Sequence, residues 1–385
     1  NYLSELSPFL TEYNITEGEM HLRSRSDSDT IDLHGDIPYP YSILVKNNMP
    51  LKTVSFKGTY DKNRLALTIN NDIHASLRNR RLTINSRDIG FDLFAISDLI
   101  KDHPVVDTNS TKSRFRFKLE ADNSYLYLNE VRRIPADKLF LQYADKGLNA
   151  QLLHGKQGGI ALEYSNNKLF IYGDGLNDDF MNDLAEFSDF KGGDLSFYIS
   201  GTTDDLEGVM QVKDTIVKDY KIISNIFAFI NTIPALVTFS VPHYTTKGLK
   251  INEAYGAFSL KENILTIKGF HVNAKELAFN GKGTVDLNTK TLDVETSLVT
   301  DATKNLARIP LLGYILVGQE DNKATTTISL TGALTDPKIE NTLAKDIGIA
   351  PFNILKRALT FPAHYIDKAQ QAINEKTIDE NKSEK

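Results

Sequence analysis

The sequence contains no cysteine, and this absence removes several classes of site at once. Without a thiol, the protein cannot use cysteine catalysis, form disulfide bonds or build thiolate metal centres. Reducing and oxidising compartments both fit a chain without cysteine, so the absence does not indicate where the protein works.

A long apolar run is also missing. A transmembrane helix needs about 20 consecutive apolar residues, and the closest stretch, residues 226–241, is interrupted by Asn231 and Pro234. The chain starts at Asn1 with neither a charged n-region nor an apolar h-region. We therefore expect any targeting segment to lie outside it, and interpret the chain as a soluble piece of a longer protein.

The chain has fewer basic than acidic residues: 44 Lys and Arg against 50 Asp and Glu, which gives a net charge of −6. A general nucleic-acid binder carries a basic surplus that neutralises phosphates, so we expect no nucleic acid among the partners. The chain has 385 residues, 41% of them hydrophobic, which is enough for a large core.

Local signatures of catalysis are absent. The eight histidines occur singly, with no HxH or HExxH spacing, and there is no GxSxG, P-loop or Rossmann glycine pattern. We therefore expect no catalytic residue, no bound metal and no cofactor, and predict that the protein is not an enzyme. One catalytic alternative stays open: an enzyme acting on surface polysaccharide through paired carboxylates that the fold brings together.

Two charged segments have both a functional and a structural interpretation. Residues 173–179, GDGLNDD, could form a Ca²⁺ loop, but they lack the ligand spacing and the distal Glu of an EF-hand. We interpret them as a turn whose Asn or Asp caps a helix at Phe180. Residues 78–81, RNRR, are interpreted as a solvent-exposed hairpin tip.

Short alternating segments dominate the rest of the chain. Strand-like runs recur from Leu51 to Gly332 at intervals of about ten residues, which is typical of all-β proteins. In residues 277–287, Leu277, Phe279 and Val285 share one face while Asn280 and the other polar residues take the opposite one; this period of two indicates a sheet with one apolar and one polar face. The predicted fold class is all-β with a few amphipathic helices, an elongated antiparallel sheet curved into an open apolar groove.

Helices are predicted at three interruptions of the strand pattern. Apolar residues recur at helical spacing in residues 176–189, in residues 217–233 and in residues 352–360. In the last segment, Pro351 fits the first helical turn. We expect Phe352, Ile354, Leu355 and Leu359 to contact a membrane, with a helix that merely covers the last strand as the alternative.

The apolar face has two interpretations. It is either the ordinary core of a closed sandwich, or an uncovered surface that accepts acyl chains. The residues that would form the floor of such a groove are Leu265, Ile267, Leu277, Phe279, Val285, Leu292, Val294, Leu298, Ile328 and Leu330.

A series of short motifs gives the C-terminal half a family likeness. It resembles the AsmA-like family of Gram-negative envelope proteins, and within it the TamB/YhdP-type members. The likeness rests on the order and spacing of the motifs, which run from the helical segment at residues 217–233 through Lys247-Gly248-Leu249-Lys250-Ile251, Gly281-x-Gly283-Thr284-Val285-Asp286-Leu287 and Ile309-Pro310-Leu311-Leu312-Gly313 to Leu330-Thr331-Gly332-x-Leu334-x-Asp336-Pro337-Lys338-Ile339.

The resemblance implies a periplasmic protein shaped as an open groove and anchored in the inner membrane by an N-terminal helix that this chain does not contain. Such proteins are thought to conduct phospholipids toward the outer membrane, with acyl chains in the groove and headgroups in solvent. The implied partners are phospholipid and both membranes, with an envelope protein as a further candidate. The alternative function is a structural or assembly factor of the envelope with a closed β core and a protein partner.

We divide the chain into four parts on this basis. Residues 1–213 would form the N-terminal part of the groove and residues 214–345 the AsmA-like segment. Residues 346–366 would contain the C-terminal amphipathic helix, and residues 367–385 are polar enough to be a disordered tail.

Overall fold

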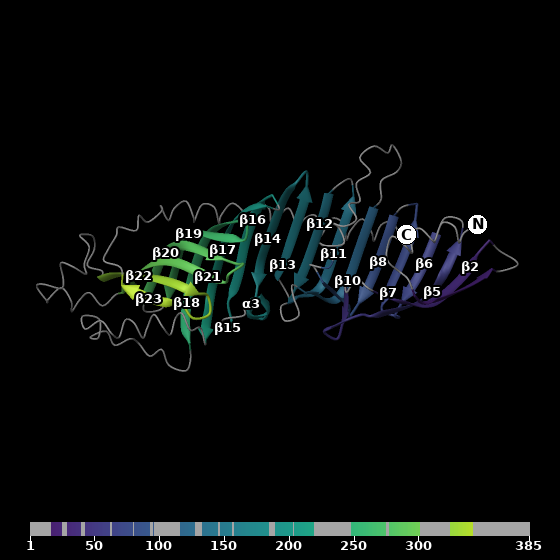
Figure 1. The fold of residues 1–385 in the computed structure, drawn as a ribbon, viewed down its shortest axis with the longest axis horizontal. Helices are drawn as coiled ribbons and strands as arrows, with labels where there is room; N and C mark the ends of the chain where they lie inside the picture. Colours follow the sequence, from purple (N-terminus) through teal and green to yellow (C-terminus); the bar gives the residue numbers. More distant parts are fainter. Residues whose placement is uncertain are drawn as a thin grey trace, which may run out of the picture. The chain divides into compact units, whose positions relative to one another are not determined.

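The computed structural model describes residues 17–24, 29–39, 43–61, 64–79, 81–92, 95, 116–127, 133–144, 147–155, 158–184, 189–202, 204–218, 248–274, 277–300 and 324–341. The chain divides into two compact units, Asn1–Asn166 and Asn167–Lys385. Both units consist mainly of β-strands (Figure 1). The predicted all-β class is therefore confirmed.

The first unit is built mostly from neighbours in the chain. Its strands are β1 (Glu19–Ser24), β2 (Ile31–Pro38), β3 (Leu44–Lys46), β4 (Met49–Pro50), β5 (Thr53–Asp61), β6 (Arg64–Ile69), β7 (Ile73–Arg78), β8 (Arg81–Arg87), β9 (Gly90–Asp92), β10 (Arg116–Tyr127), β11 (Arg133–Ala144), β12 (Gly147–His154) and β13 (Gly158–Ser165). Antiparallel pairs join β1 to β2, β2 to β5, and β5 through β6 and β7 to β8. A second antiparallel series runs from β10 through β11 and β12 to β13.

Parallel pairing joins these two series. Strand β10 runs parallel to β8, from the pair Arg116–Arg81 to the pair Asp122–Arg87, and parallel to β9 at Leu126. The prediction of an antiparallel sheet therefore holds for the other strand pairs, and the pairing of β10 with β8 and β9 departs from it. A parallel neighbour requires the chain to cross back before it pairs, and most of the residues between β9 and β10 lie outside the described part.

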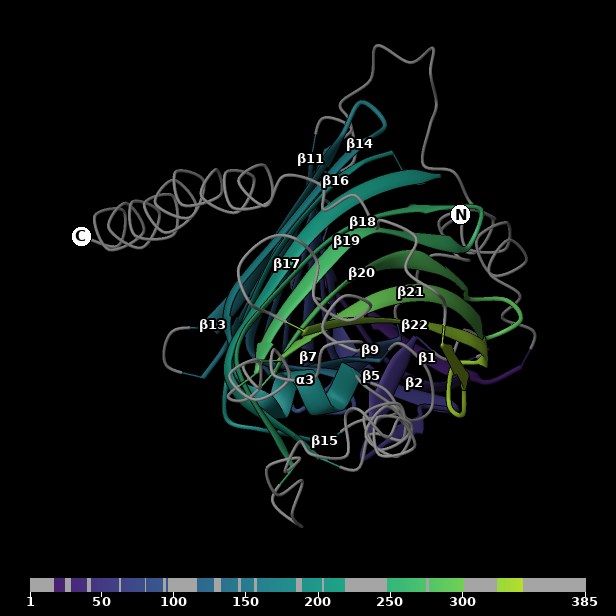
Figure 2. The same ribbon diagram turned by 90° about the vertical axis from the view of Figure 1, so that its left-hand side faces the viewer.

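The second unit follows the chain even more closely. Its elements are β14 (Lys168–Leu176), α3 (Asp178–Leu184), β15 (Asp189–Lys191), β16 (Asp194–Gly201), β17 (Asp205–Lys218), β18 (Leu249–Lys261), β19 (Ile264–Ala274), β20 (Leu277–Asp286), β21 (Thr291–Thr300), β22 (Ala324–Ala333) and β23 (Lys338–Asn341). Antiparallel pairs join β14 to β16, β16 to β17, and each later strand to the next, while β15 pairs with the end of β17. Figure 2 shows β17 to β22 bent in the same sense. No pairing among the described residues joins β14 to β23, so this sheet is open.

Short turns explain why neighbours in sequence become neighbours in space. Asn70 and Asn71 link β6 to β7 with φ of 48° and 63°, and Glu262 and Asn263 link β18 to β19 with φ of 51° and 62°. Two successive positive φ values define the type I′ turn, whose twist matches that of the two strands it joins, and Asn adopts this conformation readily. Each such turn brings the chain directly back onto the strand just completed.

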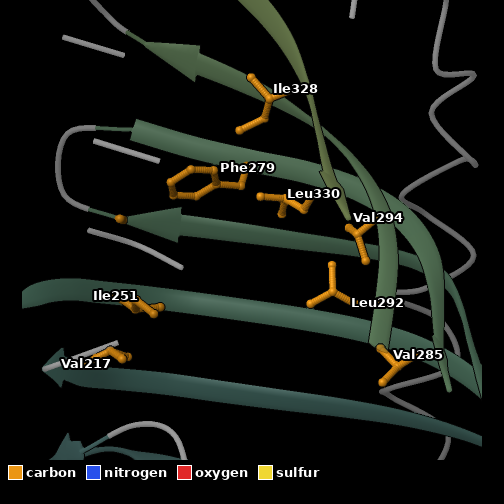
Figure 3. Close-up of a cluster of buried hydrophobic side chains, with 9 residues drawn as sticks. Val217, Ile251, Phe279, Val285, Leu292, Val294, Ile328 and Leu330 are labelled. Atoms are coloured by element: carbon orange, nitrogen blue, oxygen red, sulfur yellow. The ribbon is translucent and has the colours of Figure 1, made fainter. Parts of the chain in front are cut away.

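Each unit has its own cluster of buried apolar side chains. In the first unit the cluster is centred on β7 to β12 and includes Ile73, Leu119 and Leu139. In the second unit it comprises Val217, Ile251, Ala274, Phe279, Val285, Leu292, Val294, Ile328 and Leu330. Figure 3 shows these side chains gathered inside the curve of the strands that carry them.

The structure corrects two of the predicted helices. The segment 217–233 does not begin as a helix, because Val217 and Lys218 continue β17, with Val217 buried and paired to Leu249. The segment 176–189 is shorter than predicted, because Leu176 ends β14 and α3 covers Asp178–Leu184. The remainder of residues 217–233 and the segments 346–366 and 367–385 lie outside the described residues.

The predicted domain boundary and the division into compact units fall at different places. The units meet between Asn166 and Asn167. The boundary predicted between Lys213 and Asp214 falls inside β17, at a residue whose φ is 51°. The predicted division by function stays a prediction.

Ile328 offers a test of the second unit's core, because its side chain is fully buried at 0% exposure. Replacing it with alanine removes buried methyl and methylene groups and leaves a cavity, so Ile328→Ala should lower the free energy of unfolding by about 3 kcal/mol. Denaturant unfolding followed by circular dichroism measures this loss. The control is Leu287→Ala at a side chain that is 45% exposed, where the change should stay within about 0.5 kcal/mol; equal losses would contradict the assignment of the core.

Candidate functional site

The predicted floor residues come together on one face of the second unit. Cross-strand pairs place Leu265 opposite Val285 and Val285 opposite Leu292. In the next row on the same face, Ile267 is opposite Gly283, Gly283 opposite Val294, and Val294 opposite Leu330. Phe279 and Ile328 occupy positions of the same face, while Leu277 and Leu298 are placed by register alone, opposite Thr300 and Phe279.

The face continues over strands that the sequence analysis left out of the floor. Register extends it through β18, β17, β16 and β14, where its apolar members are Phe258, Leu260, Leu206, Met210, Val212, Leu195, Phe197, Ile199, Leu169 and Ile171. Sequence inspection missed these residues because the alternation is weak there: Tyr198 and Val209, on the opposite face, are also large and partly apolar. Only the cross-strand pairs could have identified these residues, and those pairs are known only once the register of the strands is known.

β-Bulges keep the face continuous where the sequence pattern changes phase. In β19, Leu265 and Ile267 are followed by Phe270 and Val272, and the extra residue lies in a register shift between Ile267 and Phe270. A similar shift lies between Gly173 and Leu176 of β14. A bulge places two residues opposite one and so allows a strand to change phase without turning its apolar side chains outward.

Burial changes along this face. Near the C-terminal end of the sheet, Phe279, Val294 and Leu330 are buried at 7%, 6% and 6% exposure. Farther along, Leu265 and Ile267 are half-buried, and Met210 of β17 is 40% exposed. One part of the face is therefore packed as a core, and another part presents apolar side chains to solvent.

Aromatic rings lie directly over glycines on this face. A Cβ atom on Gly208 would come within 2.4 Å of Cζ of Phe258, its cross-strand partner, and one on Gly173 would come within 2.6 Å of the Phe197 ring. The rings therefore rest in the space that a side chain would fill, and this pairing of an aromatic residue with a glycine is a known stabilising device in sheets.

On the opposite face, polar side chains of β17 to β20 form hydrogen bonds to one another. Lys268 Nζ donates to Glu207 Oε1 over 2.5 Å, and Gln211 Nε2 donates to Glu253 Oε1 over 2.9 Å. His271 Nδ1 lies 2.6 Å from Asn280 Oδ1. Because its side chains bond to one another across the strands, this face has the character of a solvated surface.

The acidic loop before α3 serves the structure, as predicted. Asn177 Oδ1 accepts a hydrogen bond from the Phe180 backbone N–H over 3.3 Å, which confirms the predicted cap. Asp178 Oδ2 accepts from the Gly192 backbone N–H over 2.7 Å, and Asp174 Oδ1 accepts from the Ser196 hydroxyl over 2.7 Å. Within the described residues, no group of three or more His, Asp or Glu side chains could hold a metal ion.

Three titratable groups meet on the polar face next to this loop. Burial is the largest cause that raises the pKa of the Tyr172 phenol far above its ordinary range, and the charge of Asp174 adds to it, so this phenol stays protonated. Desolvation is also the first cause that raises the pKa of the Asp194 carboxyl above its ordinary 3.8, followed by the charge of Asp174, against the attraction of Lys213. Structural networks of charges perturb pKa values as well as catalytic sites do, and these three groups have the arrangement of such a network.

The remaining site predictions concern the membrane. The predicted contact residues Phe352, Ile354, Leu355 and Leu359 lie outside the described residues. Among the residues that the structure does describe, there is no helix of sufficient length and apolarity to cross a membrane.

Comparison with known protein families identifies a family for this chain. The model of a family described as YhdP protein matches residues 106–339. The match begins in the first unit, ahead of β10, and extends into β23, so it includes the whole apolar face of the second unit. No curated protein and no solved structure matches the chain.

The glycine–aromatic pairs can be tested by a double-mutant cycle. Gly208→Ala should lower the free energy of unfolding by about 1–2 kcal/mol, because the Phe258 ring must leave its resting place. In the Phe258→Leu background the same change should lower it by much less, and the difference is the coupling energy of the pair. Equal losses in the two backgrounds, measured by denaturant unfolding, would show that the ring does not depend on Gly208.

The raised pKa of the Asp194 carboxyl, caused first by desolvation and then by the charge of Asp174, predicts a pH dependence of stability. A carboxyl whose pKa is raised on folding binds its proton more tightly in the native state, so stability falls as pH rises through that window, which starts at the ordinary value of 3.8. Asp194→Asn removes this loss and should raise the free energy of unfolding at pH 7 by about 0.5 kcal/mol, a small gain because the residue is exposed. Below pH 3.8 the gain should disappear. Thermal unfolding at both pH values measures this gain in stability. The control is Asp293→Asn, on the same face of the sheet as Asp194. A gain that persists in acid would contradict the electrostatic cause.

Proposed function

Because this chain belongs to the YhdP protein family, we propose that it transfers lipids in the bacterial envelope by conducting acyl chains along the apolar face of its sheet. Membership of this family suggests lipid transport of the bridge-like kind. The observation that carries the proposal for this chain is the single apolar face that runs over β14 to β22 and is still accessible at Met210.

The mechanism requires no chemistry. Leaving a C16 acyl chain in water costs about 12 kcal/mol at roughly 0.8 kcal/mol per CH₂ group. An apolar face that covers the chain at every step offsets most of this penalty, so the lipid slides without crossing water. The rings of Phe258 and Phe197, which rest over Gly208 and Gly173, would offer the acyl chain apolar surface along this path.

The finer parts of the proposal concern the place and the lipid. We infer a periplasmic location and phospholipid as the cargo, moved between inner and outer membrane, with the protein anchored in the inner membrane by an N-terminal helix. The floor residues from Leu265 to Leu330 would line the path in the AsmA-like segment, residues 214–345. Phe352, Ile354, Leu355 and Leu359 would contact a membrane at its end. No catalytic residue is required.

A second function is favoured by one observation. At the C-terminal end the face is packed, with Ile328 at 0% and Leu292 at 6% exposure. A structural or assembly factor of the envelope with a closed core and a protein partner would have such packing along the whole face. The half-buried residues of β16 to β19 favour lipid transfer over this alternative, because a closed core would bury them completely.

The test introduces a charge into the accessible part of the face. Met210→Asp should lower the rate of transfer of a fluorescent phospholipid between donor and acceptor vesicles by about tenfold or more, because a charge in the path must be desolvated each time a chain passes. The matched control is Val209→Asp, next in the same strand but on the polar face. Lipid that co-purifies with each variant is measured by mass spectrometry of an organic extract.

The outcomes separate the two functions. Under the lipid-transfer proposal Met210→Asp folds with a nearly unchanged melting temperature, because water reaches position 210, and loses both transfer and co-purified lipid. If Met210→Asp unfolds the protein, the face is a closed core and the assembly factor is the better interpretation. Transfer that is equal in Met210→Asp and Val209→Asp would mean that the lipid takes another route.

A further inference from the structure

Four arginines occupy consecutive cross-strand positions in the first unit. Arg64 of β6 is opposite Arg78 of β7, Arg78 is opposite Arg81 of β8, and Arg81 is the parallel partner of Arg116 of β10. These four strands lie side by side (Figure 1). All four residues are exposed. We call this set the arginine row. Sequence inspection found only its hairpin-tip part, because Arg64 and Arg116 are distant in the chain.

The row follows one rim of the sheet, next to apolar residues. It includes both ends of the β7–β8 turn and the first residues of β6 and β10. The chain neighbours Leu65, Leu77, Leu82 and Phe117 form the adjacent row on the other face, because successive residues of a strand point to opposite sides. Leu77 is 36% exposed and the other three are half-buried. A charged row and an apolar row therefore share one rim.

Such a row is unfavourable unless an anion compensates it. Like charges directly opposite each other on neighbouring strands destabilise a sheet, and this chain has more acidic than basic residues, with a net charge of −6. Among the described residues, no side chain forms an ion pair with any of the four arginines. The nearest acidic neighbour in register is Asp61, which lies opposite Arg64. The Asp61 Oδ1 atom accepts a hydrogen bond from the Arg64 backbone N–H over 2.9 Å. One carboxylate does not balance four guanidinium groups.

Two hollows adjoin the row and differ in character. One, of about 410 Å³, is lined by Arg64 together with polar residues of β6 to β8, among them Ser76 and His74. Ser76 Oγ accepts from Arg64 Nε over 3.3 Å, which fixes the guanidinium beside the hollow. The other, of about 370 Å³, is lined by Arg81, Arg116, Lys118 and Gln142, and also by Phe117 and Tyr143. Lys118 is paired with Glu120 over 2.6 Å, so the cationic groups of the second hollow that have no such partner are Arg81 and Arg116.

We propose that the arginine row binds the phosphate of an anionic lipid headgroup, while the acyl chains of that lipid lie against Leu77, Leu82 and Phe117. The guanidinium group suits this ligand, since its planar donors bind phosphate oxygens in pairs. A hollow lined by both arginine and aromatic side chains matches an amphiphile better than a free anion. The proposal rests on the lipid-transfer function and adds a headgroup site at the rim of the first unit.

The experiment compares two lipids that differ only in the phosphate. Binding of fluorescent phosphatidic acid and of diacylglycerol with the same acyl chains is measured for the full chain and for Arg64→Gln/Arg78→Gln/Arg81→Gln/Arg116→Gln. The variant should bind phosphatidic acid at least ~10-fold more weakly and diacylglycerol equally well, since only charge-assisted hydrogen bonds are lost. The binding of phosphatidic acid to the unsubstituted chain should also weaken with added salt.

Two matched variants control for charge and geometry. Lys250→Gln/Lys261→Gln/Lys282→Gln/Lys338→Gln removes four exposed charges from the second unit and should leave both affinities unchanged. Replacing the four arginines with lysine keeps the charge and removes the paired donors, so an affinity between those of the native chain and the glutamine variant supports direct coordination. Melting temperatures verify that every variant is folded. Equal losses of phosphatidic acid binding in the two glutamine variants would overturn the site.

A third ligand separates this site from the lipid-transfer function. Glycerol 3-phosphate carries the headgroup chemistry without acyl chains and is titrated by calorimetry. Binding as tight as that of phosphatidic acid would mean that the site takes a soluble phosphate, and would overturn the lipid assignment. If the native chain binds neither lipid, the lipid-transfer proposal is wrong, and so is the lipid headgroup site. In that case, glycerol 3-phosphate binding that is lost in the arginine-to-glutamine variant would identify a site for a soluble anion. If phosphatidic acid and diacylglycerol bind equally in all variants, lipid transfer stands and the headgroup site is wrong.

Discussion

Backbone pairing between strands that follow one another in the chain is the constraint on which this protein depends. A sheet has a side-chain period of two, so a slip of one residue between neighbouring strands would move every apolar side chain to the polar face. Turns such as Asn70–Asn71 and Glu262–Asn263 leave little room for such a slip, because their paired positive φ values fix which residues face each other. The register fixed at each turn is passed to the next strand, and a single apolar face results over the second unit.

Much of this arrangement could be predicted from the residues themselves. Where alternation is strict, as in β20 and β21, the sequence identified the apolar positions, and Phe279, Val285, Leu292 and Val294 indeed share a face. Helix α3 was predicted too long, because helical spacing of apolar residues does not reveal that Leu176 ends a strand. The start of the segment at residue 217 was misread for a related reason: Val217 fits a helical stripe and an alternating strand equally well, and only its pairing with Leu249 decides.

Other features were out of reach of sequence inspection for physical reasons. A parallel neighbour such as β8 beside β10 depends on a crossover, whose path local periodicity does not encode. The arginine row has the same origin, because Arg64, Arg78 and Arg116 become neighbours only through pairing. The apolar extension over β14 to β18 was hidden by bulges and by large residues on both faces. In each case the missing information is long-range.

The nearest-neighbour ladder of the second unit has a consequence for how such a protein can change in evolution. Within the described residues from β16 onward, each strand pairs with the strands before and after it in the ladder and with no other, apart from the short β15 beside β17. Duplication of a hairpin would therefore lengthen the sheet by about 10 Å, twice the spacing of adjacent strands, without disturbing any other pairing. An inserted single residue could be absorbed as a bulge, as in β19. The length of this sheet could thus change by genetic steps that leave every other strand pairing intact.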